Sequence, residues 1–169
     1  MTIAIRRATE SDAGAWLRLR HALWPDGSEA DHRAEIDRFF AGELREPIAV
    51  LLAEDGRGGV VGLAELSIRS SAEGCRSDRV AYLEGWYTVP AVRRRGVGRA
   101  LVAAAEQWGR DQGCTEFASD TEPDNVVSAT AHRALGFIAV GRAGCFRKAL
   151  QGGAAASQAR EAGGAVSSG

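Results

Sequence analysis

The chain has 169 residues, about the size of one domain, and 45% of them are hydrophobic, as in ordinary soluble globular proteins. Its 21 basic and 22 acidic side chains give a formal net charge of −1, which excludes the global positive field that draws proteins to nucleic acid. No apolar run approaches the ~20 residues of a membrane span, so we expect a cytoplasmic protein with neither nucleic-acid nor membrane partners. Three widely spaced cysteines favour neither a disulfide framework nor a metal site.

The carboxyl-terminal segment differs in composition from the rest of the chain. Fourteen of the nineteen residues in 151–169 are Gly, Ala or Ser, and none is aromatic. Such a segment cannot bury enough surface to offset the entropy cost of ordering it. We therefore predict a single domain over residues 1–150, followed by a disordered tail over 151–169.

The amino-terminal half reads as a strand, two helices and a hairpin. Ile3 and Ile5 occupy alternate positions next to the polar residues Thr2 and Arg6, which predicts a short strand. Apolar side chains then recur at helical spacing until the Trp-Pro-Asp-Gly segment 24–27, and Ser28 begins a second helix. Two apolar strands, 48–53 and 60–68, are joined by a glycine-rich connection and form a hairpin.

The second half alternates strands with helices. Residues 80–89 are rich in aromatic and β-branched side chains and predict a strand that ends at Pro90. A basic turn then leads into an amphipathic helix, which ends at Gly113. The remaining elements are a strand over 115–119, a helix over 124–135 and two strands over 137–140 and 145–150. This order predicts an α+β domain with a mixed sheet and one βαβ crossover near its middle.

The segment Arg93–Arg99 (RRRGVGR) lies between a predicted strand and a predicted helix. Backbone N–H groups at a helix start form an anion-binding nest, glycines admit a phosphate close to the backbone, and arginines donate charge-assisted hydrogen bonds. A diphosphate is the natural ligand of such a turn. An exposed arginine-rich turn with no ligand is the alternative, and the pattern matches neither a Walker loop nor a dinucleotide fingerprint.

Taken in context, this turn resembles the acetyl-CoA pyrophosphate motif of the GCN5-related N-acetyltransferases, the GNAT family. The residues Asn125, Ser128 and His132, with the segment 135–137, resemble the second CoA-contacting helix of that family and the strand after it. The resemblance spans about residues 1–150. Five short segments narrow it further to the aminoglycoside 6′-N-acetyltransferases: 23–25, 67–69, 83–85, 118–120 and 132–137.

The resemblance implies the GNAT fold, with a mixed central sheet of about seven strands flanked by about four helices. Acetyl-CoA, the cosubstrate, would lie in the splay between two parallel strands, the one ending at Val89 and the strand 115–119, and no metal is implied. The residues that the resemblance places against the cosubstrate are Trp86, Tyr87, Thr88, Arg94, Arg95, Gly96, Val97, Gly98, Arg99 and Asn125.

The implied reaction is direct attack of a neutral amine on the thioester carbonyl, without a covalent enzyme intermediate. Glu84, Asp120 and His132 are the candidate catalytic residues: Glu84 as a base acting through water, Asp120 as an orienting anchor, and His132 as an acid for the departing thiolate. In many family members a tyrosine stands at the position of His132. Each residue also has a structural alternative. Glu84 is then the partner of an arginine, Asp120 a turn or helix-entry residue, and His132 a packed or CoA-contacting histidine.

An acid-lined site suits a cationic acceptor. Trp24, Glu84 and Asp120 are the predicted substrate-binding residues, with Trp24 either covering a sugar ring or packing beside Trp16 in the core. We expect acetylation of the 6′-amine of aminoglycosides, a reaction of antibiotic resistance, in a homodimer. Two alternatives stay open: an acetyltransferase for polyamines, other small amines or protein amines, and a non-catalytic acyl-CoA-binding module.

Overall fold

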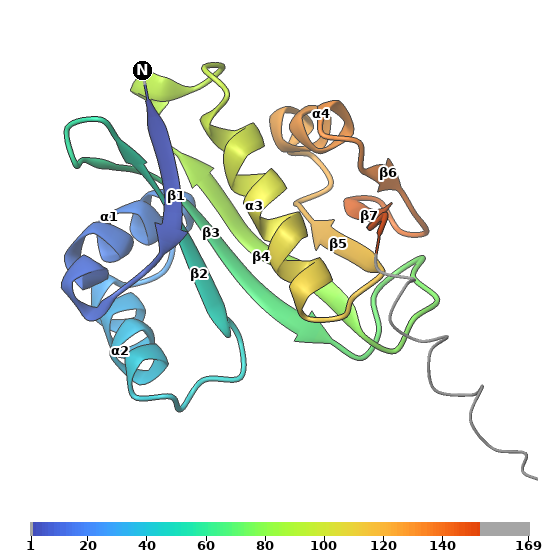
Figure 1. Ribbon diagram of the computed structural model, residues 1–169, viewed down its shortest axis with the longest axis horizontal. Coiled ribbons are helices and arrows are strands. Elements are labelled where there is room, and N and C mark those ends of the chain that lie inside the picture. The colour runs from blue at the N-terminus through green and yellow to red at the C-terminus, as the bar shows by residue number, and fades with distance from the viewer. Residues whose placement is uncertain (1, 153–169) are drawn as a thin grey trace, which may run out of the picture.

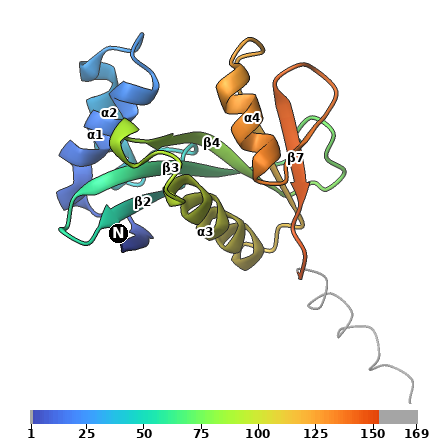
Figure 2. The same ribbon diagram turned by 90° about the horizontal axis from the view of Figure 1, so that it is seen from above.

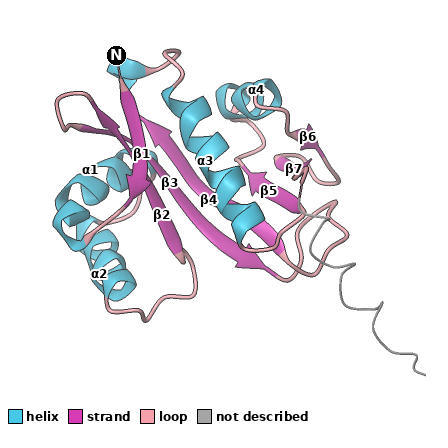
Figure 3. Cartoon of the chain, in the orientation of Figure 1, coloured by secondary structure: helices cyan, strands magenta, loops and turns pink. Residues whose placement is uncertain are grey.

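In the computed structural model, which describes residues 2–152, seven strands form one mixed sheet that is flanked by four α-helices (Figure 1, Figure 3). The strands are β1 (Ile3–Arg7), β2 (Ala49–Asp55), β3 (Val60–Arg69), β4 (Val80–Thr88), β5 (Glu116–Asp120), β6 (Ile138–Ala139) and β7 (Cys145–Ala149). The helices are α1 (Ala13–Leu23), α2 (Glu29–Phe40), α3 (Val97–Asp111) and α4 (Val126–Ala134). The strand order across the sheet is β1-β2-β3-β4-β5-β7-β6.

The predicted order of elements and the mixed sheet are confirmed. The largest difference is β6, which has only two residues, where the sequence predicts a strand over 137–140. Phe137 instead lies buried against Phe117, with ring centroids 5.5 Å apart, and so belongs to the core. Most of the predicted tail, residues 153–169, lies outside the described residues. Gln151, at the start of that predicted tail, accepts a hydrogen bond on its carbonyl from Arg110 Nε at 2.9 Å.

Strand β2 shows how one sheet carries two cores. Because side chains alternate across a strand, Val50 and Leu52 pack with Trp16 on the α1 and α2 side, while Leu51 and Ala53 pack on the α3 side. Figure 2 shows α1 and α2 on one side of these strands and α3 on the other. Both faces of the central strands are thus covered, which explains their nearly continuous apolar sequences.

The feature that positions the site is a β-bulge at Glu84. In the antiparallel pairing of β3 with β4, Glu65 pairs with Gly85 and the next residue, Leu66, pairs with Leu83, so Glu84 is the extra residue of β4. The parallel pairing of β4 with β5 ends at the same point, with Leu83 opposite Ser119. Strand β4 continues to Thr88 without β5 beside it. The predicted parallel pair is therefore present, and its two strands separate at the bulge.

Candidate functional site

A cavity of about 250 Å³ lies where β4 and β5 separate. Its walls come from the end of α1, from β4 at and beyond the bulge, from the end of β5 and the loop after it, and from α4. Its lining residues are Leu23, Trp24, Leu83, Glu84, Gly85, Trp86, Ser119, Asp120, Thr121, Glu122, Asn125, Ser128 and His132. All three candidate catalytic residues, together with Trp24, Trp86 and Asn125, are thus gathered around one space.

Glu84 is held by protein donors on both of its carboxylate oxygens. Oε1 accepts hydrogen bonds from Ser67 Oγ and, at 3.0 Å, from Arg69 Nε, while Oε2 accepts from Arg69 Nη2 at 2.6 Å. The Arg69 guanidinium also lies 3.6 Å from the centroid of the Tyr82 ring. The structure therefore gives Glu84 the arginine partner of the structural alternative and at the same time places it in the cavity wall.

Asp120 is the freer of the two carboxylates. It ends β5 and is exposed, and its Oδ1 accepts a hydrogen bond from the Tyr82 hydroxyl at 2.8 Å. This bond and burial of the ring, the larger cause, raise the pKa of Tyr82, so the phenol stays protonated and continues to donate. Asp120 thus remains oriented toward the cavity with most of its acceptor capacity available, and it is not a helix-entry residue.

Trp24 forms part of the cavity wall on the α1 side. Its indole packs over Gly85, where a Cβ atom would lie 2.5 Å from Trp24 Cη2, so only glycine allows this contact. The Arg20 guanidinium lies 5.4 Å from the centroid of the Trp24 ring. Trp16, by contrast, packs edge-on against Phe39 and Phe40. Trp24 therefore lines the cavity, and its contact with a sugar ring stays a prediction.

His132 is buried at the back of the cavity. Its ring stacks on Phe146, with centroids 4.7 Å apart, and meets Trp86 and Phe137 edge to face. Desolvation by this burial lowers the pKa of His132, and hydrogen bonding to the Ser128 backbone only partly opposes the shift. The imidazole is therefore neutral near pH 7, so it does not hold a ready proton for a leaving group.

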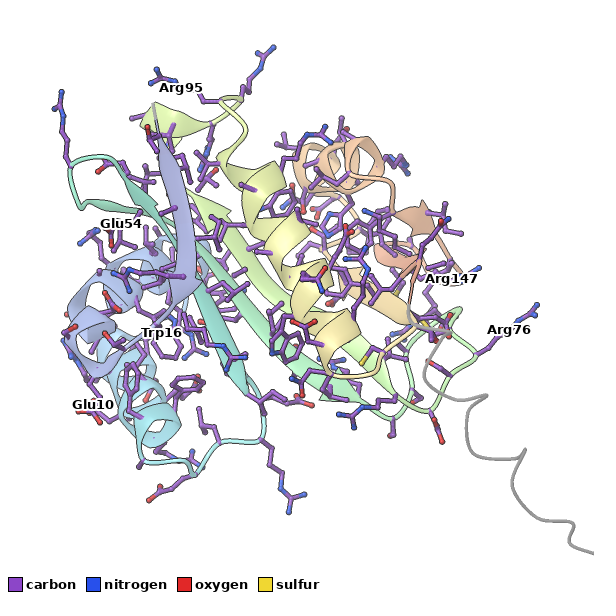
Figure 4. All side chains as sticks on the ribbon, in the orientation of Figure 1. Glu10, Trp16, Glu54, Arg76, Arg95 and Arg147 are labelled. Atoms are coloured by element: carbon purple, nitrogen blue, oxygen red, sulfur yellow. The ribbon has the colours of Figure 1, made fainter. Side chains whose placement is uncertain are left out.

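The turn before α3 has the backbone of an anion site. Gly96, with φ of +86°, is the residue before α3 in the left-handed region, and Arg94 is there too, with φ of +60°. Arg93, Arg94, Arg95 and Arg99 are exposed, and Figure 4 shows Arg95 at the outer end of this turn. Arg93 donates through Nε to the Thr88 carbonyl at 3.0 Å, so it braces the turn against β4.

Gly98 has a packing role that the sequence does not indicate. A Cβ atom there would lie 2.8 Å from Trp86 Cζ2, so the close contact with the indole requires glycine. The same glycine also leaves room for a phosphate. Val97 is buried in the core, which leaves only its backbone for a ligand. Trp86 Nε1 is buried and has no hydrogen-bond partner among the described residues. An unpaired donor beside the first turn of α3 fits a ligand that carries acceptor oxygens, as the phosphates and amides of acetyl-CoA do.

The remaining predicted cosubstrate residues lie on β4 and at the start of α4. Tyr87 and Thr88 end β4, where β5 no longer accompanies it. Asn125 caps α4, because its Oδ1 accepts from the Ser128 N–H at 3.0 Å. Its side-chain NH₂ remains available to a ligand in the cavity.

Four residues of the site were not among the candidates predicted from the sequence: Ser67, Arg69, Tyr82 and Ser119. Period-two alternation was the available signal: Ser67 and Arg69 share one face of β3, and Tyr82 shares that face of the neighbouring strand. Glu84 lies two residues after Tyr82 on β4, so the same alternation places it near Ser67 and Arg69, which both donate to it. No sequence pattern here marks the bulge.

Within residues 2–152, no group of three or more His, Cys, Asp or Glu side chains is arranged to hold a metal ion. None of the helices described is both long and apolar enough to cross a membrane.

Comparison with known sequences connects this geometry to a family. A sequence profile described as Acetyltransferase (GNAT) family matches residues 16–137. An aminoglycoside N(6′)-acetyltransferase type 1 from Klebsiella aerogenes is 52% identical over 146 residues, which cover 86% of this chain and 96% of the relative. A protein of the same name from Stenotrophomonas maltophilia is 43% identical over 148 residues, covering 87% of this chain and 94% of the relative.

Solved structures agree with the sequence matches. The structure of AAC(6′)-Iy in complex with the bisubstrate analog CoA-S-monomethyl-acetylneamine has a TM-score of 0.77 at 36% identity, covering 84% of this chain and 95% of that chain. AAC(6′)-Ih from Acinetobacter baumannii has a TM-score of 0.75 at 35% identity, covering 83% and 94%. With the sheet order and the separating parallel pair, these matches establish that the chain belongs to the GNAT acetyltransferase family.

Proposed function

We propose that the protein is an aminoglycoside 6′-N-acetyltransferase that transfers the acetyl group of acetyl-CoA to the 6′-amine by direct attack. The observation that carries the proposal is the cavity at the β4–β5 separation, whose wall holds the carboxylates Glu84, Asp120 and Glu122. Carboxylates are the expected partners of the ammonium groups of a polycationic sugar. The relatives named above, which span nearly the same length, support the same acceptor.

The residues around the turn provide a suitable acetyl-CoA site. Backbone N–H groups at the start of α3, with Arg94, Arg95 and Arg99, would hold the diphosphate. The Trp86 indole N–H and the open edge of β4 over residues 86–88 would hold the arm that carries the acetyl group, and backbone donors there would stabilise the oxyanion. Bound in this way, acetyl-CoA supplies the acetyl group as a thioester.

The two strand carboxylates have different roles in this proposal. An aminoglycoside amine arrives as an ammonium ion and must lose a proton before it attacks. Glu84 already accepts three hydrogen bonds from Ser67 and Arg69, whereas Asp120 accepts one from Tyr82. We therefore assign Asp120 as the base that acts through water, and Glu84 as the group that holds the acceptor. This reverses the preference drawn from the sequence.

The assay that tests the function follows release of the CoA thiol with acetyl-CoA and a panel of acceptors. Kanamycin and tobramycin should be turned over, and an aminoglycoside with a 6′-hydroxyl should be turned over far more slowly. Turnover of only spermidine or an amino-terminal peptide would show that the acceptor is one of the alternative amines and not an aminoglycoside. CoA binding without turnover of any amine would indicate a binding module.

The same resemblance supports three further assignments: a cytoplasmic location, a homodimer and a role in resistance. Light scattering of the purified protein measures the oligomeric state, and cell fractionation measures the location. Expression in a susceptible host, followed by the inhibitory concentration of kanamycin, tests the resistance role. A monomer in solution would contradict the homodimer without affecting the proposed reaction.

A further inference from the structure

Both ring nitrogens of His132 have hydrogen-bond partners, and the shortest contact, on Nδ1, places its hydrogen; Ser128 Oγ lies farther from Nδ1, at 3.4 Å. Nδ1 lies 2.8 Å from the Ser128 carbonyl oxygen, one turn earlier in α4. A carbonyl oxygen only accepts hydrogen bonds, so Nδ1 carries the hydrogen. In the neutral imidazole, Nε2 therefore has a free lone pair.

The second hydrogen bond connects that lone pair to a hydroxyl in the cavity wall. Nε2 lies 2.9 Å from Ser119 Oγ, so in the neutral state the Ser119 hydroxyl donates to His132. Ser119 Oγ also lies 3.3 Å from the Leu83 carbonyl oxygen. If Nε2 gains a proton, it donates to Ser119 Oγ, and the hydroxyl can then donate to Leu83 or into the cavity. The pair has two hydrogen-bonded states that differ by one proton.

The surroundings direct proton exchange through Ser119. His132 is 3% exposed and is enclosed by the rings of Trp86, Phe137 and Phe146. The charged groups that face this region among the described residues include three carboxylates of the cavity wall, Glu84, Asp120 and Glu122. Two cations lie behind the enclosing rings: the Arg133 guanidinium is 5.8 Å from the Phe146 ring centroid, and Lys148 Nζ is 5.5 Å from the Phe137 ring centroid. Burial, the largest cause, lowers the pKa of His132, and the hydrogen bond to Ser128 and the charge of Asp120 only partly oppose this shift. A proton that reaches the imidazole is therefore readily given back.

The position of Ser119 in the sheet brings this pair to the reacting groups. Ser119 is the last residue of β5 that pairs with β4, so its hydroxyl lies at the apex of the separation. Ser119 and His132 both line the cavity in which the carboxylates lie. This apex lies between the proposed thioester site on β4 and the proposed acceptor site.

We propose that Ser119 is a catalytic residue that, with His132 behind it, shuttles one proton from the attacking nitrogen to the departing sulfur. The inference rests on the proposed function. After attack, the Ser119 oxygen takes a proton from the positively charged nitrogen while its own proton passes to His132 Nε2. As the C–S bond breaks and its electron pair moves to sulfur, Nε2 returns its proton to Ser119, whose hydroxyl proton passes to the thiolate. Nitrogen loses one proton, sulfur gains one, and the pair ends as it began.

The pH dependence of kcat/KM distinguishes this shuttle from a packing role. The wild type needs a neutral amine and a neutral His132, so a plot of log kcat/KM against pH should rise with a slope near two below the His132 pKa and near one above it. Ser119→Ala and His132→Gln should each lower kcat by about 100-fold and give a slope near one throughout. A lower rate that keeps the wild-type slopes would mean packing only and would overturn the proposal.

Two matched variants and one measurement without turnover complete the test. Ser119→Thr keeps the hydroxyl. It should therefore have most of the wild-type kcat and the slope near two below the His132 pKa. Ser11→Ala makes the serine-to-alanine change at an exposed serine outside the cavity and should resemble the wild type. In the ligand-free protein, ¹⁵N NMR should find His132 neutral at pH 7 with the hydrogen on Nδ1. A hydrogen on Nε2 would overturn the shuttle.

The outcomes for the shuttle and for the proposed function are separable. If the wild type acetylates another amine and no aminoglycoside, the pH profiles are measured with that amine, and the NMR result needs no acceptor at all. If aminoglycosides are turned over and Ser119→Ala keeps the wild-type kcat and slopes, the function stands and the shuttle is wrong.

Discussion

The parallel pairing of β4 with β5 ends at Leu83 and Ser119. Glu84 and Asp120 are the next residues of the two strands, so both carboxylates lie where the strands separate. Their surroundings differ more than their positions. Glu84 is bound on both oxygens by Ser67 and Arg69, whereas Asp120 accepts a side-chain hydrogen bond from Tyr82 alone among residues 2–152. Two carboxylates a strand apart can thus divide the work of holding a cation and accepting a proton.

Conservative variants of the two carboxylates test that division. Asp120→Asn should lower kcat/KM for an aminoglycoside by about 100-fold, because the amide cannot accept a proton. Glu84→Gln should lose less than about 10-fold, because its amide oxygen still accepts from Arg69. Steady-state kinetics measures both effects, and calorimetric titration should find CoA affinity nearly unchanged. A larger loss at Glu84 would restore it as the base, and a loss of CoA affinity in both would mean structural roles.

At the scale of elements, Trp86 connects three parts of the cosubstrate site. Its indole lies against Gly98 at the start of α3 and meets His132 of α4 edge to face at 5.7 Å, while its backbone belongs to β4. The close approach of α3 requires that position 98 have no Cβ atom. Gly98, predicted from the sequence to contact a phosphate, therefore also sets the distance between α3 and β4.

Two glycine-to-alanine changes in helices separate packing from helix propensity. Gly14 in α1 has no atom within 4 Å of a built Cβ, so Gly14→Ala should stabilise the fold by up to about 1 kcal/mol. Gly98→Ala should instead destabilise it by about 1–3 kcal/mol, because Trp86 must move. Urea unfolding measures both. Equal stabilisation by the two variants would show that Trp86 does not constrain position 98.

At the scale of the whole molecule, a buried ion cluster lies behind the cavity. Glu65 on β3 is 1% exposed and accepts from Trp16 Nε1 at 2.6 Å, and Arg20 Nε lies 3.3 Å from the same oxygen. Arg20 also pairs with Glu35. This cluster connects α1 and α2 to the sheet, and its guanidinium lies next to Trp24 in the cavity wall.

The cluster should make the stability of the fold depend on pH. Burial, the largest cause, raises the pKa of Glu65 to about 7, against an opposing effect of Arg20. Because the folded state favours protonated Glu65, this residue contributes fully to the free energy of unfolding below its unfolded pKa, near 4.5. The contribution is lost as the pH rises through the folded pKa of about 7. On going from pH 5 to pH 8, the free energy of unfolding of Glu65→Gln should therefore rise by roughly 2 kcal/mol relative to that of the wild type. Urea unfolding at the two pH values checks this, and parallel pH curves for both proteins would contradict it.

Truncation tests the proposed domain boundary. Leu150 is buried and Gln151 bonds Arg110, so the cut belongs after Gly152 and not after Leu150. A chain of residues 1–152 should keep the kcat/KM and the melting temperature of the full chain, because the core and the cavity are built from residues before the cut. A loss of turnover would show that residues 153–169 contribute to function.

The sequence alone determined the order of strands and helices, the arginine–glycine turn and the family, because periodicity, turn chemistry and short motifs are local along the chain. The tertiary structure alone decided which partners each side chain meets. The pairing of β4 with β5 ends beside the bulge at Glu84, where Arg69 and Ser67 donate to one carboxylate and the Tyr82 hydroxyl to the other. The contact of Ser119 with His132 likewise joins β5 to α4. Such contacts depend on register and packing between segments distant in sequence, which local patterns do not encode.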